Sequence, residues 1–259
     1  MGRSQLFSTT ALAGLLAGSS AFGADLAPVP YRESLKLQWS GFYLGANAGY
    51  AWAADPTMNC TSIAPGTASP CLGNVFSAPR VAGEEYGIQA GYNWQSANWV
   101  FGLEADINKL GANGSSQQFP GIDPGKGADL ASSRYDWLGT ARGRVGVTNG
   151  PALFYATGGL AYGRVYHEYL QGFSNPANPA FRLSENRLGW TIGGGAELAL
   201  NQHWSVKAEY LYVDLGSSNL DISGVLFGGN FGVGGPPGTT FQRFNNHLNI
   251  VRLGANYRF

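Results

Sequence analysis

Apolar and polar side chains alternate over residues 251–259 until the chain ends. The apolar set is Val251, Leu253, Ala255, Tyr257 and Phe259. The set between them is Arg252, Gly254, Asn256 and Arg258. A period of two is that of a β-strand, because successive side chains point to opposite faces. We therefore expect a final strand with one face suited to hydrocarbon and the other to a polar environment.

The same alternation recurs along the chain and predicts eight strands. They cover residues 41–53, 84–95, 98–109, 134–148, 152–167, 186–200, 203–215 and 244–259. Each has the roughly 9–11 residues that a tilted strand needs to cross a bilayer. The segment 152–167 is the least regular, since Leu153, Phe154 and Tyr155 are apolar on both faces.

The connections between these segments alternate between short and long. The short turns are Ser96-Ala97, Asn149-Gly150 and Asn201-Gln202. The long, polar connections are about 54–83, 110–133, 168–185 and 216–243. Outer-membrane barrels have short periplasmic turns and long extracellular loops, and an even strand count leaves no open edge in lipid. The sequence therefore predicts an all-β, eight-stranded antiparallel up-and-down transmembrane β-barrel with both termini in the periplasm. A soluble β-sandwich is the alternative, but it does not explain the alternating loop lengths.

Composition excludes several other classes of protein. Charged residues make up only 12% of the chain, whereas about 25% is usual for a soluble protein. No run of 18 apolar residues follows the N-terminal segment, which excludes helical membrane spans. The formal net charge is zero, so the chain lacks the basic footprint expected of a nucleic-acid-binding protein.

The N-terminal segment 1–23 is predicted to be a signal peptide. Arg3 supplies a positive charge, residues 6–22 are mostly apolar and small, and Ala21 and Gly23 suit a cleavage site. A membrane anchor is disfavoured because the apolar stretch is short. We expect residues 24–38 to be a periplasmic lead-in and residues 39–259 to form the barrel.

Aromatic residues on the outward faces sort by strand end. Near the short turns we place Phe42, Trp94, Trp99, Tyr155, Trp204 and Phe259. Near the long loops we place Trp52, Tyr86, Trp137, Trp190 and Tyr212. Two such girdles mark the two membrane–water boundaries of a transmembrane barrel.

The opposite faces carry charge. The side chains expected inside are Glu104, Asp106, Arg142, Arg144, Arg164, Glu197, Lys207, Glu209, Arg252 and Arg258. Side chains just fill an eight-stranded barrel, and an unpaired buried charge is costly. We therefore expect a salt-bridged interior, with Glu104 and Asp106 level with Arg142 and Arg144. Glu197 should lie opposite Lys207. A narrow pore is the alternative, because inward glycines leave room: Gly45, Gly49, Gly87, Gly91, Gly193 and Gly195.

The cysteines and histidines give weaker indications. Cys60 and Cys71 are the only cysteines, and an even pair in an exported chain favours a disulfide over free thiols or metal ligation. His167 and His247 are expected near the outer rim as solvated residues, with haem or metal capture as the alternative. His203 and Ser205 faintly suggest a hydrolase pair, but no carboxylate is placed to orient the imidazole. We expect no enzyme activity and no cofactor.

The segment Trp39–Tyr50 resembles the first strand of the small outer-membrane β-barrel proteins of alphaproteobacteria, the opacity-like, surface-antigen porin family. Further matches are Ala24–Leu26, Gly91–Trp94, Gly102–Asp106, Leu153–Gly163 and Tyr257–Phe259. The resemblance implies an abundant surface antigen that supports envelope integrity; some relatives bind haemin or act as weak porins. It also implies that Tyr257 and Phe259 are recognised by the barrel-assembly machinery.

We therefore expect a structural and surface-interactive protein of the outer membrane. A small passive pore, and haem or ligand binding by the extracellular loops, are the alternative functions. The expected partners are outer-membrane lipid, lipopolysaccharide and the assembly machinery, with peptidoglycan or host surface molecules as further candidates.

Overall fold

A computed structural model of the chain describes residues 37–54, 56, 58–62, 78–118, 129–170, 180–223, 226–227, 231–232 and 240–259. The predicted signal peptide, nearly all of the predicted lead-in and Cys71 lie outside these ranges. The residues from Leu37 to Phe259 belong to one compact unit.

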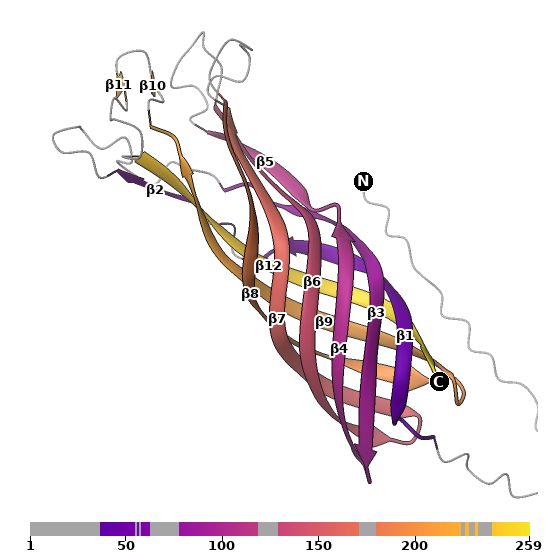
Figure 1. Ribbon diagram of the computed structural model, residues 1–259. Coiled ribbons are helices and arrows are strands. Elements are labelled where there is room, and N and C mark those ends of the chain that lie inside the picture. The colour runs from indigo at the N-terminus through magenta and orange to yellow at the C-terminus, as the bar shows by residue number, and fades with distance from the viewer. Residues whose placement is uncertain are drawn as a thin grey trace, which may run out of the picture. The chain divides into compact units, whose positions relative to one another are not determined.

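Eight long antiparallel strands build this unit (Figure 1). They are β1 (Gly41–Ala53), β3 (Ala82–Ser96), β4 (Trp99–Leu110), β6 (Asp129–Asn149), β7 (Ala152–Leu170), β8 (Ala180–Ala199), β9 (Trp204–Asp221) and β12 (Thr240–Arg258). Four short strands accompany them: β2 (Met58–Ser62), β5 (Asn113–Gln118), β10 (Leu226–Phe227) and β11 (Phe231–Gly232). β2 pairs with β12, β5 pairs with β6, and β10 pairs with β11.

The first strand closes the sheet on itself. Ala46 of β1 is the register partner of Ala255 on β12 and of Ile88 on β3. From β3 the pairing continues through β4, β6, β7, β8 and β9 back to β12. Each of the eight long strands is therefore hydrogen-bonded to a strand on both sides, and the predicted barrel fold is confirmed.

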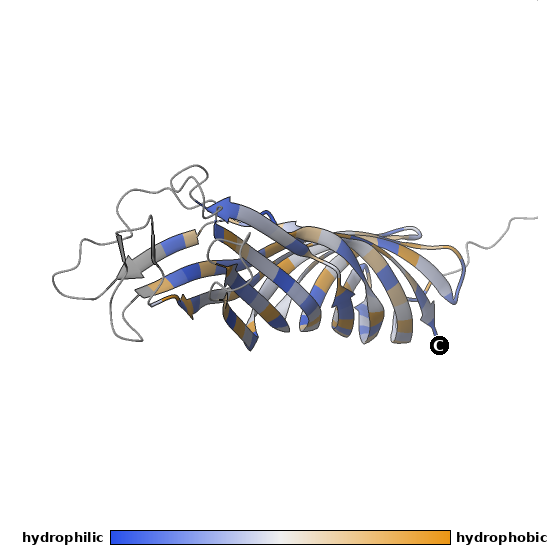
Figure 2. Cartoon of the chain, turned by 90° about the horizontal axis from the view of Figure 1, so that it is seen from above, coloured by the Kyte–Doolittle hydropathy of each residue, from blue (hydrophilic) through white to orange (hydrophobic). Residues whose placement is uncertain are grey.

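Burial along the strands is the reverse of that in a soluble protein. Leu103 and Leu253 are 59% and 67% exposed, whereas their neighbours Glu104 and Arg252 are 4% and 1% exposed. Figure 2 shows the alternation of hydrophilic and hydrophobic residues along the strands. Apolar side chains outside and charged side chains inside suit a cylinder surrounded by hydrocarbon. No helix in the described part of the chain is long and apolar enough to cross a membrane.

The strands extend further toward the long connections than predicted. β6 begins at Asp129, β8 at Ala180 and β12 at Thr240, and β2 and β5 lie within predicted loops. These extensions are rich in Ser, Asn and Gln, as in Asn113–Gln118. The prediction depended on apolar side chains facing lipid, and hydrogen bonding to a neighbouring strand continues where no lipid is present.

One strand was predicted with its two faces exchanged. On β7, Leu153, Tyr155 and His167 are buried, whereas Phe154 and Arg164 face outward. The placement of Tyr155 in the outer girdle, of Arg164 inside and of His167 as a solvated rim residue was therefore wrong. The ambiguity of the run Leu153, Phe154 and Tyr155 is the cause, because one wrong choice there inverts the whole strand.

Candidate functional site

The buried charges form one connected cluster across the barrel. We call it the interior charge cluster; its members are Glu85, Glu104, Asp106, Arg142, Arg144, Glu197, Lys207, Glu209 and Arg252. All of them except Glu85 were predicted to face inward. Glu85 is 1% exposed, and the outward position of its neighbour Tyr86 was the signal that could have placed it inside.

Glu104 on β4 is a centre of this cluster. Arg142 is its register partner on β6 and donates to it. The Nζ atom of Lys207 lies 3.0 and 2.9 Å from its two carboxylate oxygens, and the hydroxyl of Tyr43 donates to it at 2.8 Å. The adjacent acid, Asp106, also contacts Arg142, at 2.9 Å. These contacts agree with the expectation that Glu104 and Asp106 lie at about the same height in the barrel as Arg142.

Arg252 on β12 is the second centre. Its guanidinium contacts Glu209 at 2.6 Å, Asp106 at 3.0 Å and Glu85 at 3.3 Å. These carboxylates lie on three different strands, β9, β4 and β3. Arg252 thus joins strands that are not all neighbours in the sheet, through contacts across the interior.

Glu197 lies opposite Lys207, as the sequence predicts, but its contacts are with other residues. The ammonium of that lysine reaches Glu104 instead. Arg144 contacts Glu197 at 3.2 Å, and Ser205 and Asn256 donate to it at 2.5 and 3.0 Å. Ser205 is therefore held by a carboxylate in the interior, and it forms no pair with His203.

Inward glycines leave less room than predicted, because neighbours occupy their space. A Cβ atom on Gly87 would lie 2.1 Å from Oδ1 of Asn108. A Cβ on Gly91 would lie 2.2 Å from the hydroxyl of Tyr43. Close approach of polar side chains, and not open space, explains the absence of a side chain at these two positions.

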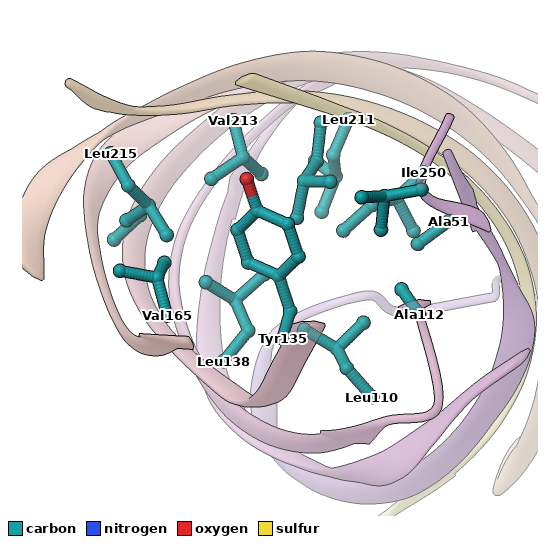
Figure 3. Packing of buried hydrophobic residues seen from close by; sticks show 13 residues of the cluster. Ala51, Leu110, Ala112, Tyr135, Leu138, Val165, Leu211, Val213, Leu215 and Ile250 are labelled. Carbon is teal, nitrogen blue, oxygen red and sulfur yellow. The ribbon is translucent and has the colours of Figure 1, made fainter. Parts of the chain in front are cut away.

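Apolar side chains close the interior on the side of the long connections (Figure 3). Tyr135 and Leu138 of β6 point into the barrel together with Leu211 of β9 and Ile250 of β12. The full apolar layer is Ala51, Val81, Leu110, Ala112, Tyr135, Leu138, Ala161, Val165, Leu211, Val213, Leu215, Leu248 and Ile250. It spans the barrel from β1 to β12, so an ion following the axis would have to cross a layer whose one side-chain polar group is the hydroxyl of Tyr135, itself bonded to Asn246.

A small polar layer and a second apolar layer follow. Nε2 of His167 lies 3.0 Å from Oδ1 of Asn246, and Nδ1 lies 2.9 Å from the hydroxyl of Ser133. Phe244 stacks on the imidazole at 4.2 Å and belongs to the second layer, with Met58, Ala131, Tyr169, Leu220 and Ile222. His247 faces outward and contacts Asp214 at 3.3 Å. The structure therefore does not bring the two histidines together for haem or metal binding.

The short-turn end is closed as well. Trp39 is fully buried and packs with Val100, Leu153, Tyr155 and Ala199. The guanidinium of Arg258 lies 4.5 Å from the centre of a ring of Trp39 and donates to the backbone carbonyls of Gln38 and Asn201. Residues just before the first strand thus fill this mouth of the barrel.

The last residues lie on the outer surface. Phe259 is 72% exposed, and its ring lies 5.2 Å from that of Tyr257 in an edge-to-face arrangement. Trp204 approaches Tyr257 from the neighbouring strand at 5.2 Å. The backbone of Cys60 lies in β2, but Cys71 is outside the described ranges, so the disulfide stays a prediction.

Closed pairing, an apolar exterior and a charged interior define the class of the molecule: it is a transmembrane β-barrel. The profile of the outer membrane protein β-barrel domain matches residues 9–259, and the chain belongs to this family.

Named relatives and a solved structure are similar to the chain over most of its length. The 31 kDa outer-membrane immunogenic protein of Brucella melitensis is 34% identical, over 98% of this chain and 95% of the relative. The 22 kDa outer membrane protein of Rhizobium leguminosarum is 28% identical, over 73% and 70%. The crystal structure of the outer membrane protein OprG from Pseudomonas aeruginosa is similar in fold, with a TM-score of 0.51 and 12% identity over 85% of this chain and 97% of that chain. The family and the names of the Brucella and Rhizobium relatives support an outer-membrane location.

Proposed function

We propose that the protein is a non-conducting, non-catalytic barrel that supports the outer membrane and presents its long connections at the cell surface. The observation that carries the proposal is the filled interior. Charges in the middle are paired with one another, and apolar layers lie toward one end and around Trp39 at the other. Such an interior suits a rigid support better than a pore.

The long connections are the proposed surface for interaction. The strands that carry them extend past the aromatic girdle, as β6 does from Trp137 to Asp129. Similarity to a Brucella protein named as an outer-membrane immunogenic protein supports exposure to the outside. We place both termini in the periplasm, with residues 1–23 removed as a signal peptide. Lipid, lipopolysaccharide and the barrel-assembly machinery are the proposed partners, with peptidoglycan or host surface molecules as further candidates at the two faces.

The filled interior predicts that the purified barrel does not conduct. In planar bilayers we expect no reproducible current steps, because an ion would have to cross an apolar layer that offers only the hydroxyl of Tyr135 in place of its water. A general porin reconstituted in the same bilayers is the control for insertion. Steps of constant size that depend on the amount of barrel inserted would favour the passive pore and contradict the proposal.

Phe259 allows recognition by the assembly machinery to be separated from fold stability. Its backbone N–H donates to the carbonyl of Phe42 at 3.0 Å, and its ring is exposed. Removing it therefore costs the folded barrel one hydrogen bond and the ring contact with Tyr257, together roughly 2 kcal/mol. We expect deletion of Phe259 to lower the yield of heat-modifiable barrel in cells, while refolding of the purified chain in detergent stays near the wild-type yield. Equal yields in cells would contradict a role in assembly.

A further inference from the structure

Three cations face outward at the long-connection boundary of the membrane. Lys109 of β4, Arg134 of β6 and Arg164 of β7 are exposed and lie on adjacent strands of the barrel (Figure 1). We call them the rim cations. Lys109 and Arg164 are both register partners of Trp137, which lies between them. Neighbouring strands in a sheet are about 4.8 Å apart, so the Cα atoms of Lys109 and Arg164, two strands apart, are separated by roughly 10 Å.

The level of these cations matches that of lipid headgroups. β4 runs for 12 residues from Trp99, in the girdle at the short-turn end, to Leu110, beside Lys109. At about 3.3 Å per residue and a tilt of about 40°, this length crosses roughly 28 Å along the membrane normal. The apolar band of such barrels is about 25 Å tall. By the same measure Lys109 lies about 25 Å from Trp99, so the rim cations lie at the edge of the hydrocarbon, next to the phosphate groups.

Local carboxylates do not neutralise the patch. Arg134 contacts Asp136 at 2.8 Å and lies over the ring of Tyr166 at 4.8 Å. Arg164 contacts the neutral Asn186 at 3.3 Å, and Lys109 has no ion-pair partner within the ranges that the structure describes. The other acids that face outward on these and the flanking strands are Glu84, Glu168 and Glu185. Glu84 forms no ion pair with the rim cations, Glu168 is paired with Arg182, and Glu185 is paired with Arg187. Arg134, Arg164 and Lys109 therefore retain net positive charge at this level.

We propose that the rim cations bind a phosphate of the phosphorylated glycolipid of the outer leaflet, lipopolysaccharide. Guanidinium groups donate paired hydrogen bonds to phosphate, and a lysine adds a compact charge. Trp137 lies between two of the cations, and Tyr162 is two residues from Arg164 on the membrane side. Their rings lie 5.4 Å apart and provide an apolar surface for the acyl chains. The inference rests on the proposed orientation, in which the long connections face the outside of the cell.

The test uses the full barrel in detergent micelles, with bis-phosphorylated lipid A as the probe. We expect the double variant Lys109→Gln/Arg164→Gln to bind lipid A at least about tenfold more weakly, because it loses two charge-assisted contacts. Dephosphorylated lipid A should bind the wild type about as weakly as lipid A binds the variant. The control variant Arg80→Gln/Arg243→Gln removes the same charge at exposed positions further from the membrane and should bind lipid A normally.

Three results would overturn the proposal. They are unchanged binding by the Lys109→Gln/Arg164→Gln variant, equal binding of lipid A with and without phosphate, and equal binding of phosphatidylglycerol, which would indicate general attraction to anionic headgroups. Micelles have no inside or outside, so this test does not depend on orientation. Maleimide labelling of an Asn113→Cys variant in intact cells tests the orientation separately.

Discussion

Replacing Arg252 by methionine is expected to lower the free energy of unfolding of the barrel by about 3–5 kcal/mol. The guanidinium contacts Glu209, Asp106 and Glu85 within 3.3 Å, and the side chain is 1% exposed. Removing it leaves carboxylates buried together with too few cations. Methionine keeps most of the volume, so the change reports the charge and not a cavity. The measurement is urea unfolding of the barrel in lipid vesicles, followed by tryptophan fluorescence.

Two further variants make this test specific. Arg164→Met removes an outward-facing guanidinium and should change the free energy of unfolding by less than about 1 kcal/mol. Adding Glu209→Gln to Arg252→Met removes one of the carboxylates that lost its guanidinium partner. The double variant should therefore recover part of the lost free energy of unfolding. An Arg252→Met barrel that unfolds at the wild-type urea concentration would show that the interior charge cluster contributes little to stability.

Substituting Gly159 by alanine is the second change expected to have a large effect. A Cβ atom at this position would lie 2.1 Å from the backbone carbonyl oxygen of Ala141 and 2.7 Å from Cα of Arg142. Neither atom can move away without separating β6 from β7. We expect a loss of at least about 3 kcal/mol in the free energy of unfolding, or failure to fold. The fraction of heat-modifiable barrel after refolding measures both outcomes.

Gly158 is a matched control for this substitution. It is the preceding residue on β7, and a Cβ atom there would meet its nearest neighbour, the carbonyl oxygen of Thr191, at 3.4 Å, an ordinary contact. Gly158→Ala should therefore refold with nearly the wild-type stability. Similar losses for both variants would mean that the chain flexibility of glycine, and not the close approach of β6, is what the strand requires.

The fold was largely predictable because the lipid boundary imposes a strict pattern on the sequence. Alternation of Leu103 with Glu104, and of Leu253 with Arg252, identifies the inward charges directly. The contacts among them follow less directly. Lys207 lies opposite Glu197, as expected, but alternation does not show that its long side chain crosses the interior to Glu104.

Two features could not be predicted from alternation alone. On β7, Phe154 and Tyr155 are both aromatic, and only the tertiary partner, Glu209, which accepts from the hydroxyl of Tyr155 at 2.9 Å, decides which one points inward. The strand extensions such as Asn113–Gln118 lie beyond the lipid, where no hydrocarbon selects one face. Trp39 was placed at the start of the barrel, but its role in filling the mouth depends on packing against distant strands.

The pairing of β1 with β12 has a consequence for the order of events during biogenesis. Arg258 donates to the carbonyl of Gln38, 220 positions earlier in the chain, so the cylinder cannot close until β12 has been synthesised. Contacts so distant in sequence form slowly. Until they form, both β1 and β12 expose unsatisfied backbone groups that would join to other chains. The polypeptide must therefore be shielded from self-association throughout its passage to the membrane.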